Sequence, residues 1–107
     1  MQSLKSPEDV SAMLEHSRKE AVFLYKHSAS CPVSFFARQE VEAAAENHPV
    51  YMVIVQQARE ISNELAQNLA VKHETPQLIL LKEARAQGVI SHGNIKLEAF
   101  DTLLQEV

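Results

Sequence analysis

Sulfur and glycine are scarce in this chain. Among 107 residues there is one cysteine, Cys31, and there are two glycines, Gly88 and Gly93. A single cysteine excludes an internal disulfide framework and suits a reducing compartment. Two isolated glycines are too few for a glycine-rich loop that wraps around a phosphate. Any redox chemistry must therefore proceed without a second thiol from the same molecule.

Basic and aromatic residues are also few. The net charge is −4, no block of Lys and Arg occurs, and aromatic residues make up 6% of the chain, which argues against strong non-specific binding to nucleic acid. No apolar run approaches the roughly 18 residues of a membrane span, and residues 1–9 contain no apolar core of signal-peptide length. With an apolar share of 46%, we expect a single cytoplasmic domain over residues 1–107, with neither nucleic acid nor a membrane as partner.

Apolar residues repeat with helical and strand periods in alternation along the chain. Ser6 is the expected cap of a first helix that begins at Pro7, and Asn94 is the expected cap of the last helix, whose inward residues end with Val107. The predicted helices cover residues 7–20, 32–48, 58–70 and 95–107. The predicted strands cover residues 21–25, 50–55, 78–81 and 89–91, with a polar turn over residues 82–88.

The order of these elements predicts the fold class. A strand–helix–strand unit requires parallel pairing with a right-handed crossover, and a helix then leads to the last two strands, which a turn joins into an antiparallel hairpin. The expected result is an α/β, thioredoxin-like fold: a four-stranded mixed sheet flanked by helices, with an extra helix at the N-terminus.

Cys31 stands where the first predicted strand gives way to the second helix. Pro32 suits the first helical position, because the N–H that it lacks would have no partner there, so Cys31 is expected at the N-cap. The free N–H groups of Val33 and Ser34 and the helix dipole then favour thiolate over thiol. Such positions lower the pKa of a cysteine from about 8.5 to roughly 3.5–7.5.

The neighbours of Cys31 bear on its chemistry. Lys26 and His27 can add positive charge, and the hydroxyl of Ser34 can donate a hydrogen bond to the sulfur but cannot form a disulfide with it. In a Cys-x-x-Cys protein the second thiol resolves a mixed disulfide internally; here an external thiol must do so. The other interpretation is a cysteine kept as a small buried hydrophobe. The polar flanks and the adjoining proline favour the reactive interpretation.

Pro76 precedes the third predicted strand. Taken alone, it is an ordinary proline at a strand entry. In the thioredoxin arrangement a proline here follows a cis peptide bond and lies beside the cysteine, which leaves the backbone of Thr75 open to pair with an incoming disulfide substrate. The five histidines do not combine with Cys31 at metal-ligand spacing, so we expect no metal.

Two segments of the chain resemble the monothiol bacilliredoxins, the YtxJ-like or BrxC family of the thioredoxin superfamily. Residues 26–28 and 31–34, Lys-His-Ser and Cys-Pro-Val-Ser, are similar to the family's Lys-His-Ser-x-x-Cys-Pro-(Ile/Val)-Ser segment. Residues 71–77, Val-Lys-His-Glu-Thr-Pro-Gln, resemble its Val-x-His-Glu-Ser-Pro-Gln segment, with Thr75 in place of Ser. Between them, Arg59, Ile61 and Ser62 resemble the start of a family helix.

The resemblance implies a thiol–disulfide oxidoreductase that removes bacillithiol from protein cysteines carrying it as a mixed disulfide. Cys31 would attack the bacillithiol sulfur, and a second bacillithiol molecule would release the adduct. No cofactor is implied: bacillithiol is a co-substrate, and bacillithiolated proteins are the partners. The residues expected to support the thiolate are Lys26, His27, Pro32, Val33 and Ser34. Those expected to bind substrate are His73, Thr75 and Pro76, with Lys26, His27, Lys72 and His73 as anchors for the malate carboxylates of bacillithiol.

Two other functions remain open from the sequence. One is a monothiol glutaredoxin-like carrier of an iron–sulfur cluster, although the Gly-Phe usual after such a cysteine is replaced by Pro32 and Val33. The other is a thioredoxin-fold interaction module with an inert cysteine, whose thiol would titrate near or above its free value.

Overall fold

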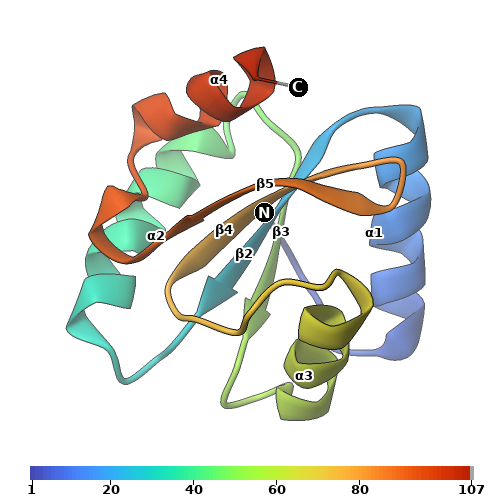
Figure 1. Cartoon of the computed structure of the whole chain (residues 1–107). Helices are drawn as coiled ribbons and strands as arrows, with labels where there is room; N and C mark the ends of the chain where they lie inside the picture. The colour runs from blue at the N-terminus through green and yellow to red at the C-terminus, as the bar shows by residue number, and fades with distance from the viewer. Residues whose placement is uncertain (107) are drawn as a thin grey trace.

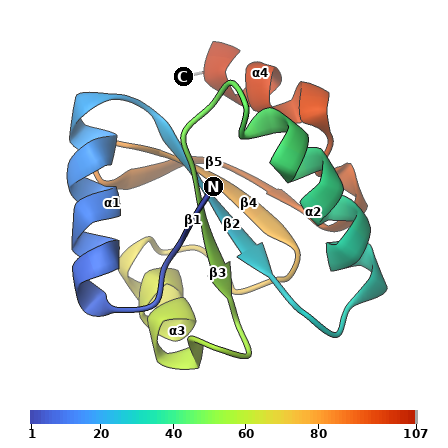
Figure 2. The ribbon, with the colours of Figure 1, turned by 180° about the vertical axis from the view of Figure 1, so that it is seen from behind.

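The computed structural model describes residues 1–106 and folds them into a five-stranded mixed sheet between two layers of helices (Figure 1). The strand order is β1-β3-β2-β4-β5. Helices α1 and α3 lie on one face of the sheet and α2 and α4 on the other, and both Figure 1 and Figure 2 show this arrangement. The strands are β1 (Gln2–Ser3), β2 (Val22–His27), β3 (Val50–Ile54), β4 (Gln77–Lys82) and β5 (Arg85–Ser91). The helices are α1 (Pro7–Lys19), α2 (Pro32–Ala44), α3 (Arg59–Asn68), the 3₁₀ turn η1 (His92–Asn94) and α4 (Leu97–Gln105).

The predicted parallel pair, β2 with β3, and the predicted antiparallel hairpin, β4 with β5, are confirmed. Strands β2 and β3 are parallel, whereas β4 runs antiparallel to both β2 and β5. The predicted count of four strands is wrong, because β1 adds a fifth by pairing in parallel with β3, Gln2 opposite Tyr51. A two-residue strand has too few residues to show a period of two, so its existence depends on a partner about 50 residues away.

The predicted start of α1 is confirmed, and the predicted start of α4 is wrong. The Ser6 side chain accepts from the backbone N–H of Asp9, whose carboxylate accepts from the Ser6 N–H, forming a capping box. Asn94 instead lies at the end of η1, and Lys96 is the N-cap of α4. The backbone is extended at Ile95, whose side chain is buried to 1% exposure, so the helix begins only after this residue. The expected inward position of Val107 lies outside the described residues.

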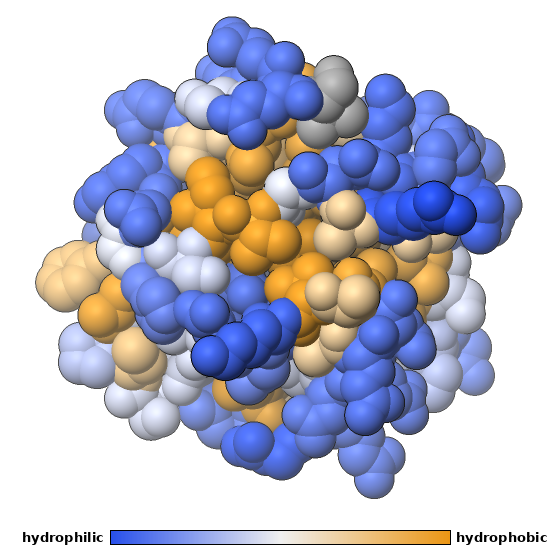
Figure 3. Space-filling model, in the orientation of Figure 1, coloured by the Kyte–Doolittle hydropathy of each residue, from blue (hydrophilic) through white to orange (hydrophobic). Residues whose placement is uncertain are grey.

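The hairpin between β4 and β5 is tighter than predicted. Residues 85–88, expected in a turn, belong to β5, and the turn consists of Glu83 and Ala84, both with positive φ. Because β5 is an edge strand, its polar side chains can alternate with half-buried ones, so a polar run here does not mark a loop. Figure 3 shows hydrophobic side chains gathered near the middle of the face seen in Figure 1 and hydrophilic ones around the rim.

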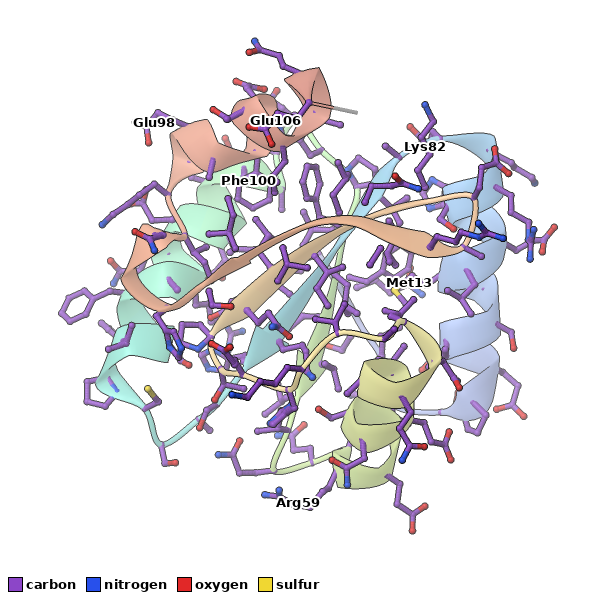
Figure 4. The ribbon with its side chains drawn as sticks, in the orientation of Figure 1. Met13, Arg59, Lys82, Glu98, Phe100 and Glu106 are labelled. Atoms are coloured by element: carbon purple, nitrogen blue, oxygen red, sulfur yellow. The ribbon has the colours of Figure 1, made fainter. Side chains whose placement is uncertain are left out.

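The core has two parts, one on each face of the sheet. In β2, Phe23 and Tyr25 pack toward α2 and α4, whereas Val22 and Leu24 pack toward α1 and α3. Met13 of α1 and Phe100 of α4 point at the sheet from opposite sides, while Arg59 at the start of α3 points away from it (Figure 4). Burial on both faces explains the continuous apolar run of β2, and this strand carries the chain to the start of α2.

Candidate active site around Cys31

The N-cap of α2 is Cys31, as predicted. Its backbone is extended, with φ −105° and ψ 120°, and Pro32 occupies the first helical position. The carbonyl of Cys31 accepts the first helical hydrogen bond, from the N–H of Phe35 at 3.1 Å. The side chain of Cys31 is partly exposed. A thiol at a helix start and open to solvent is placed for reaction with a partner from outside.

Three donors from α2 act on the sulfur. The backbone N–H of Ser34 has the largest effect, and together with the Ser34 hydroxyl and the Val33 N–H it lowers the pKa of Cys31 against an opposing effect of burial. None of these contacts reaches the geometry of a formal cap hydrogen bond, so their effect is that of dipoles aimed at the sulfur. The lowered pKa agrees with the direction expected for a cysteine at a helix N-terminus and disagrees with the value expected for an inert one.

Ser34 is held in place from two directions. Its side chain is fully buried, and its Oγ accepts a hydrogen bond from the backbone N–H of Ser28 at 3.3 Å. Its carbonyl accepts from the phenol of Tyr25 at 3.0 Å. The first turn of α2 is thereby tied to both the end of β2 and the loop that follows it, which keeps the donors aimed at Cys31.

His27 forms the other end of this hydrogen-bonded chain. The Tyr25 hydroxyl lies 3.0 Å from Nδ1 of His27, and because a carbonyl can only accept, the single phenol proton goes to Ser34. Nδ1 of His27 therefore donates to Tyr25, which assigns its neutral tautomer and leaves Nε2 as an acceptor. Burial is the main cause that lowers the pKa of His27, and the positive charge of Arg38 is the second. Burial raises the pKa of Tyr25 well above its ordinary value.

Lys26 does not join the thiol. Strand alternation turns its side chain toward the α1 and α3 face, away from the face on which α2 packs. It is 1% exposed, it does not contribute to the pKa of Cys31, and burial lowers its own pKa to about 8. The expectation that Lys26 supports the thiolate is therefore not met by the geometry of the strand.

His73 is grouped with Lys26 rather than with the sulfur. Its Nδ1 lies 3.5 Å from the hydroxyl of Ser62 on α3. Burial, followed by the positive charges of Lys26 and Arg59, lowers the pKa of His73. The imidazole itself is exposed. The role of His73 in substrate binding stays a prediction.

The Thr75–Pro76 peptide bond is cis, as predicted. Pro76 is buried, and its carbonyl accepts a hydrogen bond from the N–H of His92 at 2.8 Å. The same loop is tied on its outer side by a contact of 2.6 Å between the Glu74 carboxylate and Nε2 of His92. The loop before β4 is thus fastened to the end of β5. The pairing of Thr75 with a substrate stays a prediction.

Sequence reasoning missed a cavity of about 350 Å³ that opens beside the sulfur. The available signal was the spacing of residues 35, 38, 39 and 42, since positions four, seven, eight and eleven residues after a helix start share one side of the helix with it. The residues that line the cavity are His27, Ser28, Ala29, Cys31, Phe35, Arg38, Gln39 and Glu42.

Sequence reasoning also missed a side chain that shapes the loop before Cys31. Gln56, just after β3, accepts from the backbone N–H of Ala29 at 3.0 Å and donates to Oγ of Ser28 at 2.8 Å. Its position more than 25 residues away gives no local signal.

Within residues 1–106, no three His, Cys, Asp or Glu side chains gather closely enough to bind a metal ion, and none of the helices there has both the length and the apolar character of a membrane span.

Comparison with known proteins gives consistent likenesses. The family model described as monothiol bacilliredoxin BrxC matches residues 2–100. A solved structure described as a candidate oxidoreductase with a thioredoxin fold is 28% identical, with a TM-score of 0.87 over 96% of this chain and 92% of that one. Thioredoxin from Fasciola hepatica is 15% identical, with a TM-score of 0.81 over all of both chains. Thioredoxin from Trypanosoma brucei brucei is 13% identical, with a TM-score of 0.76 over 97% of this chain and 87% of that one. The predicted thioredoxin-like fold is confirmed.

Proposed function

Because the chain belongs to the monothiol bacilliredoxin BrxC family, we propose that it removes bacillithiol from protein cysteines that carry it as a mixed disulfide, with Cys31 as the nucleophile. The family and the fold support a redox function that uses one thiol. The observation that carries the proposal is the position of the only thiol at the start of α2. There, the N–H groups of Ser34 and Val33 and the Ser34 hydroxyl favour its thiolate.

In the first step, the Cys31 thiolate attacks the bacillithiol sulfur of the client's mixed disulfide. A disulfide bond forms between Cys31 and bacillithiol as the bond between bacillithiol and the client breaks. The client cysteine leaves as a thiolate and takes a proton from water. One disulfide replaces another, so no outside oxidant or reductant is needed.

In the second step, a further bacillithiol molecule loses its proton and attacks the bacillithiol sulfur of the adduct. Bacillithiol disulfide forms, and Cys31 departs as the thiolate. A thiol of lower pKa leaves faster, so the donors around Cys31 assist this step as well as the first. The second molecule is required because the chain contains no other thiol.

The surrounding residues support different parts of this scheme. Ser34 stabilises the thiolate and the leaving group through its N–H and hydroxyl. The similarity of Thr75 and Pro76 to the family motif supports assigning them to the client's backbone. The burial of Lys26 argues against its use as an anchor for bacillithiol, since a side chain 1% exposed has no open path to a ligand.

The test is transfer of bacillithiol from a modified client, followed by mass spectrometry of both proteins. The wild type is expected to return the client to its free thiol and to gain one bacillithiol on Cys31. Cys31→Ser keeps an N-cap residue, so it should fold as the wild type does, yet it should leave the client modified because a serine hydroxyl is not ionised near neutral pH. Gln105→Ser, at the end of α4, is the matched control and should react as the wild type does. Transfer by Cys31→Ser at the wild-type rate would remove Cys31 from the mechanism.

A further inference from the structure

Helix α2 has two hollows on opposite sides, and only one of them contains the thiol. At about 100° per residue, positions 35, 38, 39 and 42 lie on the same side of the helix as Cys31 and line the cavity of about 350 Å³. Positions 33, 36 and 37 lie on the other side and line a smaller hollow of about 250 Å³, with His92 and Lys96 across from them. We call the larger one the Arg38 cavity.

The Arg38 cavity has the chemistry of a site for a small, charged and polar molecule. Arg38 supplies a cation whose side chain is 38% exposed, and its partner Glu42 is only loosely held, with Nε and Oε1 3.8 Å apart. Gln39 adds an amide, and Phe35, 59% exposed, presents an aromatic ring. His27 is 6% exposed and makes no hydrogen bond through Nε2 to any residue in the described part of the chain. A cation with a weak, replaceable partner is suited to receive a ligand carboxylate.

The geometry of thiol–disulfide exchange decides which molecule would occupy the cavity. The attacking, central and leaving sulfurs lie close to one line, so the leaving client thiol and the incoming small thiol must use the same side of the adduct. The small thiol that is bonded to Cys31 is the central partner in both steps. It therefore needs a place of its own, off that line and next to the Cys31 sulfur, throughout the cycle.

We propose that the Arg38 cavity holds the small thiol while it is joined to Cys31, with Arg38 binding one of its carboxylates in place of Glu42. This rests on the proposed function, and it names the part of the chain that selects which small thiol the protein accepts. Arg38 and Glu42 then have opposite effects. Arg38 attracts a thiol that bears carboxylates, whereas Glu42 competes with that thiol for the guanidinium.

The experiment measures the rate at which Cys31 gains an adduct from two symmetrical disulfides. One is bacillithiol disulfide, whose malate groups carry carboxylates, and the other is hydroxyethyl disulfide, which carries no charge. Arg38→Gln is expected to slow the reaction with bacillithiol disulfide about tenfold, the loss of one charged hydrogen bond at a partly exposed site. It should change the reaction with hydroxyethyl disulfide less than about twofold, because the sulfur and its donors are untouched.

Two further variants sharpen the test. Glu42→Gln should speed the reaction with bacillithiol disulfide severalfold by freeing Arg38, and this gain should disappear when Arg38→Gln is also present. Lys96→Gln removes one cation from the hollow on the other side of α2, so it is the matched control for net charge and should leave both rates unchanged.

The outcomes separate this inference from the proposed function. If Arg38→Gln slows both disulfides equally or neither of them, or if Lys96→Gln has the same effect, the assignment of the Arg38 cavity is overturned while the function stands. If the wild type takes up hydroxyethyl disulfide but gains no adduct from bacillithiol disulfide, the proposed function fails and this inference fails with it.

Discussion

Replacing Lys26 with methionine should make the protein more stable at neutral pH. Lys26 is buried to 1% exposure in the middle of the sheet, and no carboxylate in residues 1–106 lies within ion-pair distance of its ammonium group. Burial lowers its pKa from 10.5 to about 8. An ammonium without a counter-ion is costly to bury, whereas methionine has a similar length and no charge.

The size of the effect follows from the pKa. The difference between 10.5 and about 8, at about 1.36 kcal/mol per pKa unit, corresponds to about 3 kcal/mol of destabilisation when the group is fully protonated. Because methionine will not reproduce the packing of the lysine stem perfectly, we expect Lys26→Met to raise the free energy of unfolding by about 2–3 kcal/mol at pH 7. Gln77 lies directly opposite Lys26 in β4, and its buried Oε1 has no hydrogen-bond partner, so the substitution breaks no hydrogen bond between the two side chains.

The pH dependence distinguishes this cause from better packing. The folded state binds Lys26's proton less tightly than the unfolded state, so the cost is fully present below pH 8. It is relieved as the pH rises from about 8 toward 10.5. The advantage of Lys26→Met over the wild type should therefore shrink by about 2 kcal/mol, to about 0–1 kcal/mol at pH 9.5.

Urea unfolding at pH 7, 8.5 and 9.5 measures both quantities. Lys82→Met, at the exposed end of β4, is the matched control and should change stability by less than about 0.5 kcal/mol at every pH. Equal stability of Lys26→Met and the wild type at pH 7 would refute the argument. An advantage that stays constant from pH 7 to pH 9.5 would refute the electrostatic explanation and leave packing as the cause.

Three other substitutions test the site and the core. Ser34→Ala should raise the pKa of Cys31 because it removes the hydroxyl donor; ultraviolet absorbance of the thiolate against pH measures this, and an unchanged titration would remove that donor from the account. Ser34→Cys should form a disulfide with Cys31, because the side chain at position 34 is directed at the sulfur, and should release bacillithiol without a second molecule. Mass spectrometry would show the loss of two hydrogens, whereas a variant that keeps a stable adduct would contradict it. Gly88→Ala should lower stability by about 1–3 kcal/mol, since a Cβ there would lie 2.7 Å from Cδ2 of Leu103; an unchanged midpoint of urea unfolding would show that Leu103 moves aside freely.

Local patterns were enough to predict most of the framework. Ser6 followed by Pro7 and Asp9 is a cap whose hydrogen bonds lie within four residues of one another, so the sequence specifies it directly. The same holds for Cys31 and Pro32 at the start of α2. The lowering of the Cys31 pKa also follows from the sequence, because the groups that donate to its sulfur belong to Val33 and Ser34, which come soon after it along the chain.

Other features needed the tertiary structure because their partners are distant in sequence. Strand β1 exists only through its pairing with β3, and the loop before Cys31 is held by Gln56 from the end of β3. The sequence suggested that Lys26 lies beside the thiol. Strand β2 runs two residues further than its apolar residues indicate, so the alternation of side chains places Lys26 on the opposite face of the sheet. Which polar residues of α2 line a cavity beside the thiol depends on how the helix is seated against β2. A helical period gives the angle between side chains but not the direction in which the helix faces, and that direction is set by packing across the whole sheet.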